Sequence, residues 1–211
     1  MKKPQSMKAL EELGRVRLSE NFFFRDFLHS EIADFYRIAN IPEDPDLAVA
    51  TGTRLCEDLL EPLQRTFGRL HIRSGYRSRE VNAFGNRNRL NCSTNAASAA
   101  DHIWDMRDAE GFMGATACIV VPWAWDRRDT IGGWQALAWW IHDHLPYGSL
   151  CFFPKLWAVN IQWHERPARR IRSYAGPAGL LTKAGMANHE GSHAAFYAGL
   201  PGLVANQKLI R

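Results

Sequence analysis

Apolar residues recur at intervals of three and four in three stretches of the chain, a spacing that predicts helices. The first stretch follows Ser19 and ends before Pro42, and a short polar helix over 7–17 precedes it. The second runs over 47–67, where the interior Pro62 predicts a kink or a break because proline removes a helical hydrogen bond. The third helix is predicted over 132–145.

Short apolar runs flanked by turn residues predict strands in the rest of the chain. Residues 77–95, rich in Asn and Arg, have the composition of a polar loop, and the chain after 172 is rich in Gly, Ala and Pro. The second of these segments predicts an extended tail on the surface. The predicted strands lie at 70–73, 102–104, 117–121, 150–153 and 157–163.

The order of these elements favours one main domain of the α+β class. Helices come first, and strands follow with one helix between them, which predicts a small and largely antiparallel sheet flanked by helices. We expect a helical lead over 1–18, the main domain over 19–172 and a C-terminal extension over 173–211.

Composition excludes several classes of protein without selecting one. With 211 residues, 46% of them hydrophobic, the chain can bury a core and is neither a disordered tail nor a collagen-like repeat. The net charge of +4 permits contact with an acidic polymer but does not indicate a nucleic-acid partner. No apolar run predicts a membrane span or a signal peptide, so we expect a cytoplasmic protein as synthesised.

The cysteines and histidines are sufficient in number for a metal site or a nucleophilic site. No C-x-x-C spacing is present, which excludes a zinc ribbon and a thioredoxin-type pair and predicts reduced, structural thiols. The segment 189–193 matches the H-E-x-x-H zinc pattern, which requires a helix. Gly191 and Ser192 disfavour that helix, so we predict a surface turn with His189 and His193 exposed. The cysteines are Cys56, Cys92, Cys118 and Cys151.

Three motifs occur in an order typical of one family. Phe24-Arg25-Asp26-Phe27 leads to Asn40-Ile41-Pro42, Ser74-Gly75-Tyr76-Arg77-Ser78 follows a predicted strand, and Ser93-Thr94-Asn95 lies downstream. Over residues 19–165, about two thirds of the chain, the sequence resembles the zinc D-alanyl-D-alanine carboxypeptidases. That family includes VanY-type enzymes and phage L-alanyl-D-glutamate endopeptidases, and it shares its fold with the Hedgehog signalling domain. The resemblance implies this D-Ala-D-Ala metallopeptidase/Hedgehog-like fold.

The resemblance also implies a zinc ion held by His, Asp and His, with a Glu as general base and the arginine of Ser-Gly-Tyr-Arg gripping the substrate. Without gaps, Asn95 and Asn160 occupy the two His positions and His102 the Asp position; a one-residue deletion places Asp101 there instead. The strand over 150–153 offers no carboxylate as base. Because an amide is a poor zinc ligand, the resemblance implies a relative without zinc-dependent hydrolysis and with no cofactor.

We therefore predict a peptidase-like protein that binds a peptide, such as a peptidoglycan stem peptide. An active peptidase with a rearranged zinc site, built from Asp101 or Asp105 with His102 and His164, is the first alternative. A structural or interaction component of a phage or another assembly is the second, and a phage or prophage origin fits both. The predicted binding residues are Arg77, Ser93, Asn95, His102, Asn160 and Gln162.

A second cluster of basic residues lies near the end of the main domain. Four arginines fall between residues 166 and 172. Such a run predicts a solvated strand end, with binding of teichoic acid, nucleic acid or another acidic partner as the alternative.

Overall fold

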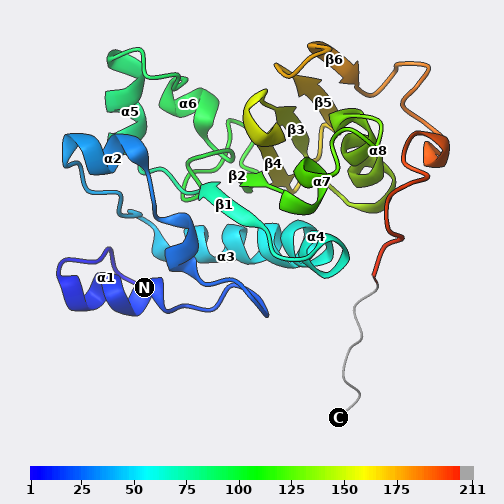
Figure 1. Cartoon of the computed structure of the whole chain (residues 1–211). Coiled ribbons are helices and arrows are strands. Elements are labelled where there is room, and N and C mark those ends of the chain that lie inside the picture. The colour runs from blue at the N-terminus through cyan, green and yellow to red at the C-terminus, as the bar shows by residue number, and fades with distance from the viewer. Residues whose placement is uncertain (205–211) are drawn as a thin grey trace.

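A six-stranded mixed sheet organises the chain in a computed structural model that describes residues 1–204 (Figure 1). Its strand order is β1-β2-β4-β3-β5-β6, and every neighbouring pair is antiparallel except β3 and β5, which are parallel. The strands are β1 (His71–Ser74), β2 (Gly114–Val120), β3 (Ser149–Phe152), β4 (Val159–His164), β5 (Arg170–Ser173) and β6 (Gly179–Thr182).

The predicted α+β class is confirmed, but the sheet is larger than predicted and is not purely antiparallel. β5 comes from the arginine run and β6 from the segment expected to be an extended tail. β5 pairs with β3, with which it is not consecutive in the chain, and β6 in turn pairs with β5, so a local pattern does not reveal that these strands extend the sheet. The strand predicted over 102–104 is wrong: this segment forms a turn, and its apolar Trp104 is buried with Nε1 donating to the Thr116 carbonyl at 3.1 Å.

The first predicted helix is divided in two by a capping serine. A 3₁₀ turn, η1 (Phe24–Phe27), is followed by α2 (Glu31–Tyr36), and the Ser30 hydroxyl accepts a hydrogen bond from the Ala33 N–H. Ser30 therefore begins a new helix inside the predicted one. The preceding α1 (Met7–Gly14) matches the expected short polar helix.

The predicted second helix is continuous, with a change of hydrogen bonding just before its proline. α3 (Pro45–Leu55) passes through a π-helical turn, η2 (Cys56–Leu60), into α4 (Glu61–Phe67). Pro62 lies in the first turn of α4, directly after the π turn in which the Glu61 N–H bonds to the Cys56 carbonyl, so its missing N–H falls where the hydrogen-bond pattern already changes. The irregularity expected at Pro62 is thus a local widening rather than a break.

The segment predicted as a polar loop contains a helix. α5 (Arg79–Arg87) begins after Ser78, whose hydroxyl accepts from the Val81 N–H at 3.2 Å. Its polar face is exposed, so composition alone suggested a loop. Among residues 1–204, no helix is long and apolar enough to cross a membrane. The remaining helices are α6 (Asn95–Ser98), α7 (Pro122–Asp126), α8 (Trp134–His144) and the 3₁₀ turns η3 (Lys155–Trp157) and η4 (Ala194–Phe196).

The two faces of the sheet differ in character. One face is apolar and packs against α3 and α8, with the rings of Trp134 and Phe152 5.0 Å apart. The other face carries polar residues and is partly covered by α2, α5 and α6, which lie on the left of Figure 1. The core residues on the apolar face include Ala117, Ile119, Leu150, Phe152, Val159, Ile161 and Ile171.

Candidate functional site

One row of side chains crosses the polar face of the sheet. The strand registers place Ser74 opposite Cys118, Cys118 opposite Asn160, Asn160 opposite Cys151, and Cys151 opposite Arg172. Residues directly opposite each other project to the same face of a sheet. The row therefore carries a thiol on each side of the Asn160 amide and a guanidinium at one end.

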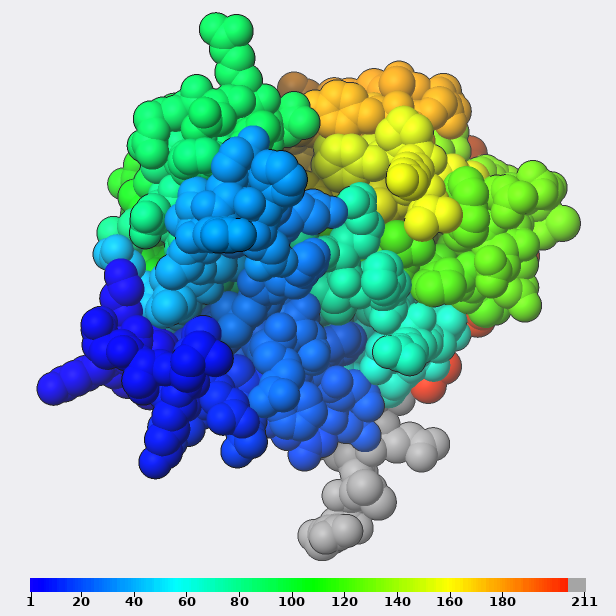
Figure 2. Space-filling view, turned by 60° about the vertical axis from the view of Figure 1, so that its left-hand side comes forward, coloured from blue at the N-terminus to red at the C-terminus, as the bar shows by residue number. Residues whose placement is uncertain are grey.

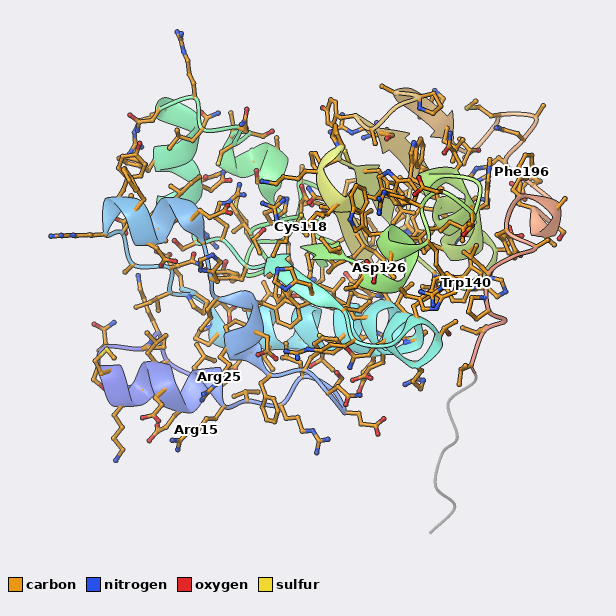
Figure 3. All side chains as sticks on the ribbon, in the orientation of Figure 1. Arg15, Arg25, Cys118, Asp126, Trp140 and Phe196 are labelled. Atoms are coloured by element: carbon orange, nitrogen blue, oxygen red, sulfur yellow. The ribbon has the colours of Figure 1, made fainter. Side chains whose placement is uncertain are left out.

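A cleft of about 670 Å³ lies over this row. Its walls come from the start of α2, the turn between β1 and α5, the loop before α6 and the turn containing His102. Figure 2 shows α2 and the α5 segment beside the yellow-to-orange segment of β3 to β5, and Figure 3 places Cys118 in the middle of the molecule. The cleft is thus built from segments that are distant in the sequence.

His102 and Asn160 meet at the centre of the cleft. The Asn160 Nδ2 atom lies 3.2 Å from His102 Nε2, while His102 Nδ1 is buried and has no hydrogen-bond partner within residues 1–204. Burial lowers the pKa of His102, and the neighbouring Asp101 carboxylate and a backbone contact with Gly75 only partly oppose this effect. The ring is therefore neutral at pH 7, and donation by Asn160 to Nε2 leaves its proton on Nδ1.

Arginines stand at both ends of the cleft. Arg77 is half-buried and its Nη1 donates to Asn82 Oδ1 at 3.1 Å, which fixes the guanidinium without neutralising it. A register shift in β1 between Ile72 and Ser74 brings Arg73 to the cleft, where it pairs with Glu31 at 3.5 Å. Arg172, at the other end, lies over the Tyr174 ring at 5.4 Å.

The two thiols of the row are not prepared as nucleophiles. Burial raises the pKa of Cys118 and of Cys151, although Arg73 and Arg172 respectively act in the opposite direction. A thiol with a raised pKa is protonated at neutral pH and is a weak nucleophile. Both cysteines are free and buried, and Cys118 lines the floor of the cleft as a small side chain.

Four of the predicted binding residues line this cleft and two do not. Arg77, Ser93, His102 and Asn160 border it. The Asn95 amide is used inside the fold: its Oδ1 accepts from Asn82 at 2.9 Å and its Nδ2 donates to the Arg79 carbonyl. Gln162 donates to the Ala100 carbonyl at 3.1 Å and lines a neighbouring cavity.

The residues at the positions that the resemblance assigns to zinc do not fit that ion. His102 supplies one imidazole, whereas Asn95 and Asn160 supply amides, and the Asn95 amide is already engaged. The rearranged set is also dispersed. Asp101 accepts from the Thr116 hydroxyl, His164 Nε2 pairs with Asp108 at 3.2 Å, and Asp105 accepts from the backbone N–H of Glu43.

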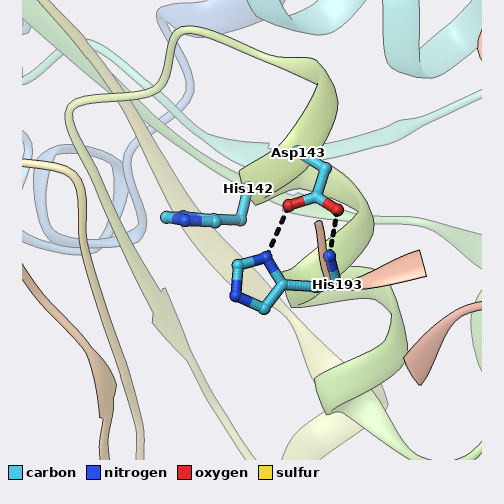
Figure 4. A group of neighbouring side chains, drawn as sticks. All are labelled: His142, Asp143 and His193. Atoms are coloured by element: carbon cyan, nitrogen blue, oxygen red, sulfur yellow. Dashed lines mark hydrogen bonds and ion pairs between the residues drawn. The ribbon is translucent and has the colours of Figure 1, made fainter. Parts of the chain in front are cut away.

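A different His-Asp-His cluster joins α8 to the C-terminal segment (Figure 4). In this cluster, called here the histidine cluster, the potential ligand atoms of His142, Asp143 and His193 lie within 4.8 Å of one another. Every ring nitrogen already has a partner. His193 Nδ1 contacts Asp143 at 2.7 Å and its Nε2 faces the Asn188 carbonyl, while His142 contacts the Tyr147 hydroxyl and the His189 carbonyl.

The histidine cluster corrects the prediction of a surface turn with two exposed histidines. The segment 189–193 is not helical, as predicted, but His189 and His193 are only 6% and 5% exposed. His193 stacks on Trp139 with the rings 4.0 Å apart and nearly parallel. The two histidines are buried because the segment 189–193 packs against α8. No local sequence feature of this segment predicts that packing.

Sequence reasoning missed several residues of the cleft. Arg172 was visible only as part of a basic run, and Arg73 and Tyr174 carried no signal because strand register decides which face they occupy. Exposed on the rim, Tyr174 stacks on Phe153 with the rings 5.7 Å apart. A comparison of the chain with known protein families, with curated proteins and with solved structures gives no match.

Proposed function

We propose that the chain is a peptide-binding protein that uses the cleft to hold a carboxylate-bearing peptide, such as a peptidoglycan stem peptide, without zinc-dependent hydrolysis. One observation carries the proposal. Arg77 and Arg172 have no carboxylate partner among residues 1–204, and they border the same cleft as the buried, unpartnered Nδ1 of His102. Buried polar groups without partners are costly, so a ligand that supplies acceptors is favoured there.

Each residue has a distinct part in the proposed binding. The planar guanidinium of Arg77 can grip a carboxylate through two parallel hydrogen bonds, and its contact with Asn82 holds it in place. His102 is neutral and donates through Nδ1 to a peptide carbonyl, while the Asn160 amide holds the ring from the other side. Phe153 and Tyr174 offer an apolar and aromatic wall to a side chain of the peptide.

The groups of the cleft that could serve as nucleophile or base are protonated or already engaged, which supports binding rather than turnover: Glu31 pairs with Arg73 and His29 with Asp34. Cys118 and Cys151 are protonated thiols, and the carboxylate nearest to His102, that of Asp101, is held by Thr116. A general base must be free to take a proton from water or a nucleophile. Hydrolysis by the zinc mechanism requires ligands that Asn95 and Asn160 do not supply.

The test is calorimetric titration of the protein with a synthetic stem peptide, comparing the wild type with Arg77→Gln. Loss of a bidentate charged hydrogen bond predicts affinity lower by about tenfold or more. Arg87→Gln is the matched control, because it removes the same charge from an exposed site at the end of α5, outside the cleft. This control is expected to bind like the wild type.

Two outcomes contradict the proposal. No binding of the stem peptide at millimolar concentration favours the structural or interaction role instead. Stoichiometric zinc in the purified protein, together with release of amino groups from peptidoglycan that a chelator abolishes, favours the active peptidase.

A further inference from the structure

β5 presents one row of exposed side chains on the polar face of the sheet. Arg170 and Arg172 are exposed while Ile171 and Ser173, between and after them, are buried. Tyr174 continues the alternation just past the strand and is 56% exposed. We call Arg170, Arg172 and Tyr174 the β5 strip. Residues i and i+2 of a strand are about 6.7 Å apart, so neighbouring members of the strip are separated by about this distance.

The β5 strip connects the cleft to a second cavity. That cavity, of about 660 Å³, is lined by Arg170, Gln162, His164 and Lys183, whereas Arg172 and Tyr174 line the cleft. Asp101 borders both. The two cavities therefore lie on the same face of the sheet and share one wall, and β5 runs past both.

The charges along this path do not balance within residues 1–204. Arg170, Arg172 and Lys183 have no carboxylate within ion-pair distance in this part of the chain. Of the acidic groups of the second cavity, Glu110 forms an ion pair with Arg166 at 2.6 Å, Asp108 contacts His164 at 3.2 Å, and Asp101 accepts from the Thr116 hydroxyl, which leaves its charge in place. Taken together, the two cavities still carry an excess of positive charge, because four cations without an ion-pair partner in the described residues, Arg77, Arg170, Arg172 and Lys183, outnumber the two carboxylates Asp101 and Asp108.

The strip is also held in a definite geometry. The Arg172 guanidinium lies over the Tyr174 ring, and that ring stacks in turn on Phe153. Cation–π stacking limits the motion of an otherwise flexible arginine. An anionic ligand group thus meets Arg172 at a position that the sheet and the two rings fix.

We propose that the peptide-binding site extends along the β5 strip and recognises an extended acidic peptide whose acidic side chains occupy alternate positions. Alternate side chains of an extended peptide project to the same side at about 6.7 Å, the spacing of Arg170 and Arg172 on their strand. One acidic side chain meets Arg172 in the cleft, and the other meets Arg170 and Lys183 in the second cavity. This inference rests on the proposed function and adds the charge pattern of the ligand.

The test uses three fluorescent peptides of equal length on a glycine–serine background, measured by anisotropy at low ionic strength. The first has glutamates at alternate positions, the second has them at adjacent positions, and the third has one glutamate replaced by glutamine. The first two carry the same net charge, so any difference between them reports geometry. We expect the alternate peptide to bind about fivefold more tightly than the other two, the upper range for exposed ion pairs.

Substitutions in the β5 strip test whether it causes the preference for glutamates at alternate positions. Arg170→Gln is expected to remove the advantage of the alternate peptide while leaving the affinity for the single-glutamate peptide unchanged. Arg172→Gln is expected to weaken all three, and the exposed Arg87→Gln to change none of them.

The outcomes separate this inference from the proposed function. Equal binding of alternate and adjacent peptides, all of it weakened by Arg77→Gln, overturns recognition along the strip and leaves the cleft as the peptide site. An equal loss for all peptides in Arg170→Gln also overturns it, since that result reports long-range attraction only. If no peptide binds, both the strip and the cleft lose their proposed ligand.

Discussion

The cleft and the histidine cluster both contain histidines and carboxylates, yet they differ in how completely their polar atoms are used. In the histidine cluster, both ring nitrogens of His142 and His193 have partners, and Asp143 accepts from His193 and from Tyr197. In the cleft, His102 Nδ1 and the Arg172 charge have none within residues 1–204. A saturated network stabilises a fold, whereas an unsaturated one is available to a ligand.

This contrast also shows why residue identity alone misleads about metal sites. The histidine cluster has the donor set that zinc prefers, and residue type alone favours it over the cleft. The ring nitrogens of His193, however, are already engaged: one faces the Asp143 carboxylate and the other the Asn188 carbonyl. The contact with Asp143 holds the C-terminal segment against α8.

The largest effect is expected from removing the charge in the centre of the histidine cluster. Asp143→Asn leaves the buried His193 ring without its anionic partner, and loss of one member of a buried pair costs about 3 kcal/mol of unfolding free energy. Urea unfolding followed by tryptophan fluorescence measures this loss. Asp126→Asn, on the exposed end of α7, is the control and is expected to change stability little. A loss as small as that of the control contradicts the role of the cluster as a stabilising network.

The same substitution at two histidines is expected to have different consequences. His193→Phe keeps the stacking on Trp139 but leaves Asp143 and the Asn188 carbonyl with one hydrogen bond fewer, which lowers stability by about 2 kcal/mol. His102→Phe removes one unpartnered buried nitrogen and one hydrogen bond, that from Asn160 Nδ2 to Nε2, so the gain and the loss partly offset and stability changes by about 1 kcal/mol or less, while affinity for the stem peptide falls. Equal destabilisation by both variants, in parallel urea titrations, contradicts the difference drawn between the two regions.

The most gradual of these effects is a dependence of stability on pH below neutrality. Burial lowers the pKa of His142 and of His102 below the ordinary value of 6.5, so the unfolded chain binds protons at these sites before the native protein does. Stability is therefore full above pH 6.5 and falls as the pH decreases from 6.5 toward the lowered values, by at most about 1.4 kcal/mol per pH unit for each group.

His142→Gln tests which region dominates this dependence, by urea unfolding at several pH values. The expected slope between pH 6.5 and the lowered pKa is shallower than in the wild type, because one titrating group is lost. If the free energy of unfolding depends on pH in the variant as it does in the wild type, the dependence is assigned to His102 in the cleft. A free energy of unfolding that increases toward acid pH contradicts the assignment to buried neutral histidines.

The sequence predicted much of the local structure because that structure depends on neighbouring residues. The helical spacing over 132–145 and the turn around Ser-Gly-Tyr-Arg are local, and the structure contains α8 and a strand-to-helix turn there. Errors arose where long-range packing decided the outcome. Ile103 and Trp104 form an apolar run that is buried in a turn, and Arg79–Arg87 is a polar helix that resembles a loop in composition.

The candidate site was predicted in part, for the same reason. Arg77, Ser93, His102 and Asn160 reach one cleft, whereas Asn95 and Gln162 find partners inside the fold. The spacing of residues along the chain does not predict which side-chain amide finds a hydrogen-bond partner inside the fold. The other members of the cleft, Arg73 and Arg172, face it only because of the register of β1 and β5.

The sequence by itself determined which chemical groups the protein has, the α+β class and the local starts of its helices. It also determined that amides stand where the resemblance expects zinc ligands. Only the tertiary structure decided which groups remain without partners: the Asp143 carboxylate contacts His193, whereas no carboxylate within residues 1–204 forms an ion pair with Arg172. The physical reason is that the availability of a polar group depends on the neighbours that folding brings to it, and those neighbours lie far away in the sequence.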